Sequence, residues 1–482
     1  MRKKIFKRSV IVVKMNNKNT IVKILALTMA LILTVGVLAG CGKTVNDKDD
    51  QGRTIIKTDQ YPVEEGKDRD NYDARVARFL EANPDVVVEP QSYHFTLNSF
   101  YQLAEGGQLP TMFTTNFTEV EQCINAGYTA DLSKVLKDRG YEGMFDQKVM
   151  DIFTRDGKIY AIPTAVYYLG LAYNVEMFEA AGLMNEDGTP KQPATWDEVV
   201  EFAKKIKEAT GEAGFVLPTT NNLGGWISTP IFWSFGVDFM EQDENGKWNA
   251  TFNSPEAIAA LQWIKDLKWV HDILPSNTLV DDAEQTKLFA GNRGGMIISL
   301  GSNVGHFANF DMSADSIGFM ALPAGPKRHV TLMGGHVMNV NGNATYDQID
   351  AVFRWNEMKQ TYKVTEEYKT NLKNQVDKQL EDGILVGIKN ASVWSSQAEV
   401  SQYYDKYIED NANININHVK LYNDFISNCP ADIQAEEPVC VQELYAIIDG
   451  CIQEVLTNKD ADCAAVIEKA ASDFQMNYLN NL

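Results

Sequence analysis

Apolar and polar positions along the chain alternate in blocks that predict strands and helices in turn. Short apolar runs at 53–58, 85–89 and 111–115 predict strands, and the second run is bounded by prolines, as is typical of a buried parallel strand. Apolar residues at helical spacing predict helices over 72–82 and 97–105 between these runs. The resulting β–α–β–α–β order favours a parallel sheet covered by helices.

Later segments carry clear signals for the starts of helices. Thr195 stands three residues before Glu198, which is the spacing of a capping box. Ser254 is followed by Pro255, a residue favoured at the first position of a helix. We expect a solvated helical excursion at 357–382 and closing amphipathic helices at 444–456 and 464–479.

The N-terminal segment has a different organisation. Residues 1–23 contain eight Lys and Arg and no acidic residue, and an apolar run follows at 24–38. The run is long enough for the core of a signal peptide but short for a membrane span. It closes with Leu-Ala-Gly-Cys at 38–41, which resembles the lipobox of bacterial lipoproteins. This resemblance implies cleavage before Cys41, lipid on its sulfur and stable anchoring in the bilayer by several acyl chains.

We therefore expect a lipoprotein signal peptide at 1–40 and a polar, acidic tether at 41–52. The alternative is an uncleaved membrane helix with a buried thiol. Either Met1 or Met15 serves as the start, because both leave basic residues ahead of the apolar run.

The charge of the chain limits its partners. The formal net charge is −21, and residues 1–40 contribute only cations, so the remainder is more acidic still. Nucleic acid and anionic lipid head groups would be repelled, and the net charge fits a neutral or cationic ligand better than an anionic one. The length after residue 40 suits two lobes, and we expect a monomer.

Six cysteines are present. With Cys41 lipidated, five remain, and Cys429 and Cys440 are the expected disulfide pair because they flank a loop that contains prolines. Cys451 and Cys463 lie in helical patterns and fit small core residues. No spacing matches a zinc site, so we expect no metal and no cofactor.

Segments spread over the chain resemble extracellular solute-binding proteins of the sugar-binding kind, the lipoprotein components of ABC transporters. Part of the likeness lies in the early segments FLEANPDVVVE and FYQLAEGGQLPTMFTTN, although Thr111 replaces the usual aspartate. The most specific segment is DGKIYAIPTAVYYLGLAYNVEMFEAAGL at 156–183. The other matching segments are 127–140, 195–211, 252–267, 288–303 and 322–340.

The resemblance implies an α/β, two-lobe periplasmic-binding-protein-like fold (type II) with a ligand cleft between the lobes. We expect lobe 1 to comprise 53–164 and 323–381, and lobe 2 to comprise 165–322 and 382–482. The chain would then cross between the lobes near 162–168, 321–325 and 382–388.

A sugar needs flat rings to stack on and polar side chains that pair with its hydroxyls. We rank Trp226 first, because it lies in a glycine-rich loop that no core pattern claims, although a lobe-packing indole is the alternative. Trp394 is a second candidate platform. Alternation along a strand allows only one of Tyr167 and Tyr168 to face the cleft, and we choose Tyr167.

Polar and backbone contacts complete the expected site. Asn116 and Asn303 follow predicted strands, and Gly335 allows close approach of the backbone to a hydroxyl. His336 is a hydrogen-bond donor there, although a lone histidine is as often structural. Weaker candidates are Tyr61, Tyr93 and Tyr445, and the aromatics expected to serve packing are Trp233, Trp248, Trp263, Trp269 and Trp355.

These features predict a lipid-anchored protein that closes over a carbohydrate and delivers it to the membrane permease of an ABC importer. The alternatives are a surface-anchored carbohydrate-active enzyme and a sensor subunit of the same fold. The chain contains none of the familiar hydrolase, phosphate-loop or dinucleotide motifs, which disfavours the enzyme. The ligand itself stays open among mono-, di- and oligosaccharides and other solutes.

Overall fold

The computed structural model describes residues 47–304, 307, 310, 312–389, 391–428 and 432–482. Residues 47–482 form one compact unit. The expected signal peptide at 1–40, the lipid-bearing Cys41 and the first part of the tether lie outside the described residues. Within the described part, no helix is both long and apolar enough to span a bilayer.

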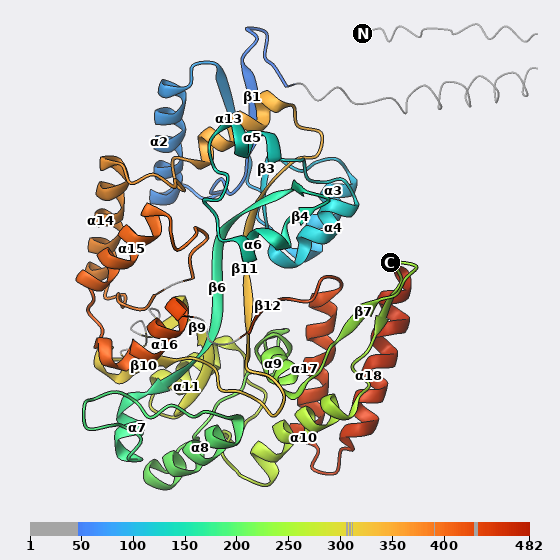
Figure 1. Ribbon diagram of the computed structural model, residues 1–482, viewed down its shortest axis with the longest axis vertical. Helices are drawn as coiled ribbons and strands as arrows, with labels where there is room; N and C mark the ends of the chain where they lie inside the picture. The colour runs from blue at the N-terminus through green and yellow to red at the C-terminus, as the bar shows by residue number, and fades with distance from the viewer. Residues whose placement is uncertain (1–46, 305–306, 308–309, 311, 390, 429–431) are drawn as a thin grey trace, which may run out of the picture. The chain divides into compact units, whose positions relative to one another are not determined.

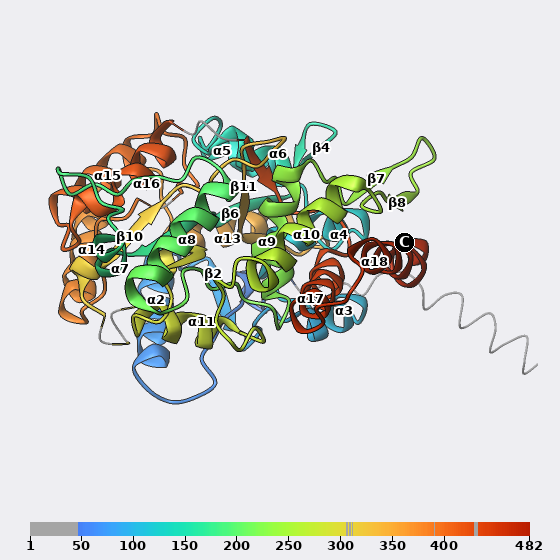
Figure 2. The same ribbon diagram turned by 90° about the horizontal axis from the view of Figure 1, so that it is seen from below.

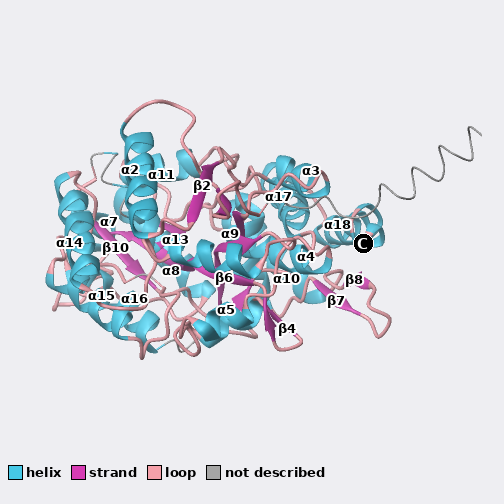
Figure 3. Ribbon diagram, turned by 90° about the horizontal axis from the view of Figure 1, so that it is seen from above, coloured by secondary structure: helices cyan, strands magenta, loops and turns pink. Residues whose placement is uncertain are grey.

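The longer strands lie inside the unit with helices around them, whereas two short hairpins, at 154–159 and 240–250, lie at its edge (Figure 3). The strands are β1 Thr54–Thr58, β2 Val86–Pro90, β3 Met112–Asn116, β4 Thr154–Arg155, β5 Lys158–Ile159, β6 Ala161–Asn174, β7 Met240–Gln242, β8 Trp248–Ala250, β9 Met296–Leu300, β10 Ile317–Met320, β11 Val330–Val340 and β12 Asp432–Ala435.

Helices fill most of the connections between the strands. The longer helices are α2 Lys67–Ala82, α3 Leu97–Glu105, α8 Trp196–Thr210, α9 Leu223–Phe235, α10 Pro255–Trp269, α11 Asp282–Ala290, α13 Tyr346–Asn356, α14 Glu366–Glu381, α15 Glu399–Asp410, α16 Ile416–Asn428, α17 Val441–Thr457 and α18 Cys463–Asn477. The shorter ones are α4 Val120–Asn125, α5 Ser133–Asp138, α6 Gln147–Ile152, α7 Val175–Ala180 and α12 Gly301–Val304, with 3-10 turns at η1 Phe117–Glu119, η3 Ala314–Ser316 and η4 Leu479–Asn481.

Strand β6 is the central element of the unit, and it runs beside β11 through the middle of Figure 1. Its first half pairs antiparallel with β11, and its second half pairs with β9 and β10. Viewed from below, α8 and α10 lie in front of these two strands (Figure 2). One continuous strand therefore spans the expected crossing at 162–168.

The predicted parallel pairing is confirmed for β1 and β2 but is wrong for β3. Thr54 pairs with Val86 in a parallel ladder. β3 instead forms an antiparallel ladder with β11, in which Asn116 lies opposite His336. Local patterns predict that a segment is a strand, but they do not specify a partner more than 200 residues away.

Most predicted helices form where expected. Thr195 and Ser254 cap their helices by accepting the backbone N–H groups of Glu198 and Ala257. The Glu198 carboxylate accepts the N–H of Ala194, one residue before the capping-box position. The first predicted helix begins earlier than expected, at Lys67. Apolar spacing did not reveal this start, because the first turn of the helix is polar and faces solvent. The expected excursion is helical only over α14.

Buried side chains form several hydrophobic clusters rather than one core. One cluster joins residues from β1 to the first half of β6 with residues of β11 and α13. Another joins the second half of β6 with α8, α9, α10, α17 and α18. The first cluster also contains Trp394, Ala398 and Val400, a segment that the expected boundary at residue 382 assigns to lobe 2.

Candidate ligand-binding site

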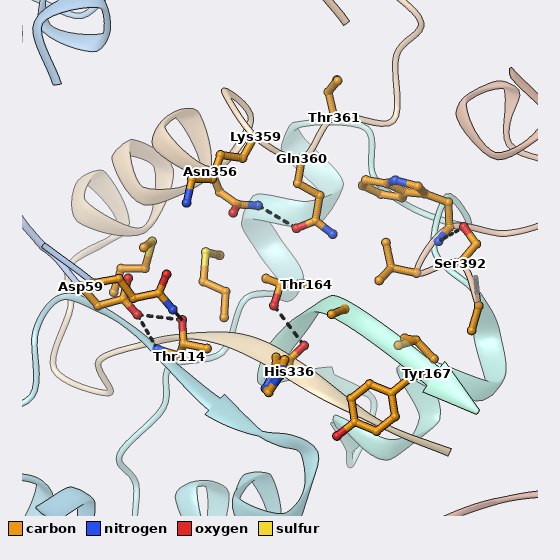
Figure 4. A pocket seen from close by; sticks show the side chains of 18 of the residues that line it. Asp59, Thr114, Thr164, Tyr167, His336, Asn356, Lys359, Gln360, Thr361 and Ser392 are labelled. Carbon is orange, nitrogen blue, oxygen red and sulfur yellow. Dashed lines mark hydrogen bonds between the residues drawn. The ribbon is translucent and has the colours of Figure 1, made fainter. Parts of the chain in front are cut away.

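A cavity of about 850 Å³ lies where β1 and β3 end, beside the middle of β6 and β11 (Figure 4). Asn116 is the last residue of β3, and Asp59 directly follows β1. Tyr167 lines the cavity from β6, and His336 lines it from β11. Crevices at the carboxyl ends of strands are the usual ligand sites of α/β sheets.

Asp59 is a buried carboxylate on the cavity wall. Its side chain is only 3 % exposed, and Oδ2 accepts hydrogen bonds from the Thr114 backbone N–H at 2.8 Å and the Thr114 hydroxyl at 2.7 Å. Burial raises the pKa of Asp59 to about 6, although the hydrogen bonds from Thr114 oppose this shift. The carboxylate is thus held in one orientation beside the cavity.

Asn116 and His336 are cross-strand neighbours joined by a hydrogen bond. His336 Nδ1 lies 3.1 Å from Asn116 Oδ1. An amide oxygen only accepts, so Nδ1 carries the proton and Nε2 is left as an acceptor. Desolvation lowers the pKa of His336, which favours the neutral imidazole. The ring is exposed to the cavity and presents an acceptor to a hydroxyl group.

Tyr167 connects the cavity to a second group of side chains. Its ring centroid lies 6.2 Å from that of His336 and 6.1 Å from that of Trp226, with both contacts edge to face. Gly334 faces the same ring, and a Cβ at this position would lie 2.5 Å from it. Glycine is therefore required for Tyr167 to occupy this place.

Glu436 lies behind this aromatic pair. It follows β12, and its Oε1 accepts a hydrogen bond from the Tyr445 hydroxyl at 3.0 Å. Burial raises the pKa of Glu436 to about 7, and its interactions with Tyr445 and Trp226 only partly oppose the shift. Burial and the Glu436 carboxylate in turn raise the pKa of Tyr167, so its hydroxyl stays protonated.

Several expected site residues come together and others do not. Asn116, Tyr167 and His336 all line the cavity. Asn303 lies on α12 and does not line it, whereas its neighbour Ser302 does. Gly335 faces away, because a Cβ there would lie 2.2 Å from the Ala165 carbonyl oxygen. This glycine permits close packing of β6 on β11.

The two tryptophan candidates differ from their expected settings. Trp226 lies in the first turns of α9 rather than in a loop, because Gly224 and Gly225 pack closely on α17 and do not break the helix. Its indole is partly buried. Trp394 lines the cavity but is only 8 % exposed and stacks on Phe145 at 4.5 Å, so neither ring face is open to a ligand.

The remaining aromatic candidates serve packing. Trp233 is fully buried and donates its indole N–H to Glu437 Oε1 at 2.9 Å. Tyr445 is 1 % exposed. The rings of Tyr61, Tyr93, Trp248, Trp263 and Trp355 lie in or against the hydrophobic clusters, and the indole of Trp269 donates to the Val455 carbonyl oxygen.

Sequence reasoning missed several polar residues of the cavity. Asp59 and Gln60 directly follow the first predicted strand, and His94 follows the second. Their position after strand ends was the signal that could have found them. Arg75 had no such signal, because it lies within a helical pattern. Glu436, which lies near Tyr167 but does not line the cavity, had none either, because it comes from a segment more than 300 residues further on.

The cavity offers hydrogen-bond donors and acceptors rather than a reactive constellation. Among the described residues that line it, Asp59 is the one carboxylate, whereas glycoside hydrolysis normally needs a pair. Across the described part of the chain, no three His, Cys, Asp or Glu side chains gather to hold a metal ion. Cys440 carries a free thiol, and its expected partner Cys429 lies outside the described residues.

Comparisons with known proteins agree with this geometry. Residues 61–357 match the family model described as bacterial extracellular solute-binding protein. An arabinooligosaccharide-binding protein of Halalkalibacterium halodurans is 35 % identical over 132 residues, which cover 27 % of this chain and 26 % of the relative. The chain thus spans about a quarter of that relative's length, and at most about half of the other curated relatives.

Two solved structures resemble the chain over nearly its whole length. Maltose-bound MalE3 of T. maritima superposes with a TM-score of 0.63 at 20 % identity, covering 88 % of this chain and 99 % of that one. UgpB of Mycobacterium tuberculosis in complex with glycerophosphocholine gives 0.62 at 15 % identity, covering 89 % and 98 %. The predicted two-lobe α/β fold is confirmed by this likeness.

Proposed function

Because this chain belongs to the bacterial extracellular solute-binding proteins, we propose that it captures a carbohydrate outside the cytoplasm and delivers it to the permease of an ABC importer. One observation carries the proposal. The Tyr167 ring lines a cavity whose wall also holds Asp59, Asn116 and His336, and the Trp226 ring, which does not line the cavity, packs edge to face against Tyr167. A ring edge and a set of fixed hydrogen-bonding groups match the apolar faces and hydroxyl rim of a sugar.

Capture occurs by closure of two lobes over the ligand. The proposed lobes are 53–164 with 323–381 and 165–322 with 382–482; the division of the hydrophobic clusters along β6 supports the boundary near residue 165, whereas Trp394, Ala398 and Val400 pack with the first lobe. Ligand favours the closed form only to the extent that it binds that form more tightly. Contacts from both lobes, such as those of Asn116 and Tyr167, provide the differential affinity.

A lipid on Cys41 holds the protein at the outer face of the membrane, and the segment after it acts as the tether. The tether ends before Asp47, because Asp47 is hydrogen-bonded to Ile55 and Lys48 is paired with Asp347. Binding there keeps the captured sugar close to the permease subunits. The proposal assigns no chemistry to this chain, and ATP hydrolysis belongs to other subunits. Relatives that are named for a carbohydrate ligand, such as the arabinooligosaccharide-binding protein, support this function.

The experiment is a thermal-shift screen of the purified protein against mono-, di- and oligosaccharides, followed by calorimetry. A ligand that binds only the native state raises the melting temperature, by an amount that grows with its concentration over Kd. The proposal expects at least one carbohydrate with a micromolar or lower Kd and no change in the sugar after incubation. Shortening of the sugar would instead identify an enzyme.

A further inference from the structure

The cavity extends from Tyr167 toward α2 and α13, and its wall carries positively charged side chains there. Arg75 of α2 and Lys359, just after α13, line this extension. A second hollow of about 770 Å³ continues it past α14. The two hollows share the residues Lys359, Thr361, Tyr368, Gln375 and Tyr404, and the second adds Arg78 and Arg354. Figure 4 shows Lys359 beside Asn356 and Gln360.

Arg75 is held without a carboxylate partner. Its guanidinium carbon lies 4.5 Å from the ring centroid of Tyr72 and 4.4 Å from that of Trp355. No acidic oxygen of a described residue comes within 4.0 Å of it, and its Nε is buried without a hydrogen-bond partner. Burial lowers its pKa, and Tyr72 and the more distant Asp59 offset this only in part. A desolvated cation with incomplete compensation is costly for the fold.

Lys359 is likewise unpaired among the described residues, although it is exposed to solvent. Its neighbours differ from it in this respect. On the adjacent α14, Lys369, Lys373 and Lys378 each form an ion pair with an acidic residue of the same helix or its end. Arg75 and Lys359 thus differ from these lysines in forming no ion pair with a described residue.

The acidic residues nearby have other partners or lie outside the extension. Asp59 accepts both Thr114 hydrogen bonds, and Glu357 is bound by Arg139 and Tyr141. Arg354 is itself paired with Asp85 and Asp350. Glu367 lines the second hollow but not the first. The wall that Arg75 and Lys359 form thus carries positive charge that the nearby acidic residues do not neutralise.

We propose that this extension binds an acidic group on the ligand, so that the ligand is an anionic oligosaccharide carrying a carboxylate, phosphate or sulfate. A neutral sugar unit then lies at Tyr167 and the acidic unit lies at Arg75 and Lys359. This inference rests on the proposed carbohydrate-binding function. It also departs from the ligand that the net charge favours, because net charge averages the whole surface whereas recognition depends on the local wall.

The test compares matched pairs of ligands on the full chain purified in detergent. Uronic-acid oligosaccharides are measured beside their carboxyl-reduced, neutral forms, and phosphorylated and sulfated oligosaccharides beside their unmodified parents. Calorimetry is run at low and high salt. We expect one acidic member to bind about tenfold or more tightly than its neutral partner, with an advantage that shrinks at high salt. The type of acidic group that gains most identifies its chemistry.

Two variants locate the acidic group. Lys359→Met changes an exposed side chain and is expected to remove most of the advantage of the acidic ligand while leaving neutral binding unchanged. Arg75→Met keeps an apolar chain between the two rings and should act in the same way. Lys373→Met, which alters a paired cation on α14 away from the cavity, serves as the control and should change neither affinity.

Each outcome decides between the two proposals. Neutral members that bind as tightly as their acidic partners would overturn this inference and leave the carbohydrate-binding function standing. Equal weakening of neutral and acidic binding by Lys359→Met would also overturn it, since the lysine would then not recognise charge. If no carbohydrate of either kind binds, the proposed function itself fails.

Discussion

The ring of Tyr167 meets the ring of Trp226 edge to face, with centroids 6.1 Å apart and planes at 89°. Tyr167 comes from the middle of β6, and Trp226 comes from the start of α9, 59 positions later in the chain. A Cβ on Gly334 would meet both the Tyr167 ring and the Glu436 carboxylate. Four segments that are distant in sequence thus converge at Tyr167, which lines the cavity, and mutation of single residues can test what this arrangement does.

Removal of the Trp226 indole is expected to weaken carbohydrate binding without unfolding the protein. Trp226→Ala should raise Kd by about 10- to 100-fold, because Tyr167 loses the ring that packs edge to face against it and holds it at the cavity. The side chain is only partly buried, so the circular dichroism spectrum should not change. Calorimetry with the ligand found in the screen measures the effect. Trp269→Phe lies outside the cavity and is the control. An unchanged affinity of Trp226→Ala would remove this residue from the site.

Neutralisation of Asp59 is expected to stabilise the protein at neutral pH. Its pKa is raised to about 6 in the folded state, so the ionised form at pH 7.5 is less favourable than in the unfolded chain, by up to about 3 kcal/mol. Asp59→Asn keeps an oxygen that accepts the Thr114 hydrogen bonds. Denaturant melts at pH 7.5 should show higher stability, with the difference fading below pH 5. A less stable variant at pH 7.5 would contradict this reasoning.

Stability is also expected to increase as the pH falls from 8 to 6. Burial raises the pKa values of Glu436 and Glu437 to about 7, so the folded state binds more protons than the unfolded state in this range. The lowered pKa values of His336 and His418 act in the opposite direction. Glu437→Gln should therefore flatten the profile of melting temperature against pH. A wild-type profile that falls steadily from pH 8 to 6 would show that the histidines dominate.

Gly335 is expected to tolerate no side chain. A Cβ there would lie 2.2 Å from the Ala165 carbonyl oxygen and 2.5 Å from the Phe117 ring, so Gly335→Ala must push β6 and β11 apart. We expect a loss of about 2–4 kcal/mol. Gly450, inside α17, has open space on the side where a Cβ would stand, with no atom within 4 Å, and Gly450→Ala should gain about 0.5–1 kcal/mol. Urea unfolding of both variants measures the contrast, and equal effects would refute it.

Lipid anchoring through Cys41 is expected to depend on its thiol. Cys41→Ser removes the sulfur that carries the lipid, so the precursor should remain unprocessed or be released without acyl chains. Fractionation of cells and mass spectrometry of the N-terminus distinguish the two forms. A processed Cys41→Ser protein that stays in the membrane would rule out the lipobox.

Local sequence patterns determined most of the elements. Helix α3 has the bounds that apolar spacing predicts, and Thr195 and Ser254 cap their helices as their neighbours in sequence require. Such features depend on residues a few positions apart, so the chain specifies them before it folds. The alternation of a strand also predicted that only one of Tyr167 and Tyr168 faces the cleft, and Tyr167 is the one that lines the cavity.

Only the tertiary structure decided how distant segments meet. The pairing of Asn116 with His336 across β3 and β11, the contact of Glu436 with Tyr445 beside Trp226, and the burial of Trp394 against Phe145 all join residues that no local pattern relates. The two glycines before Trp226 led to the wrong prediction of a loop, because glycine is required both in loops and where a helix packs closely on another element. Sequence records each residue's preference for burial or exposure, but the free energy of packing is shared among residues that meet only in the folded chain.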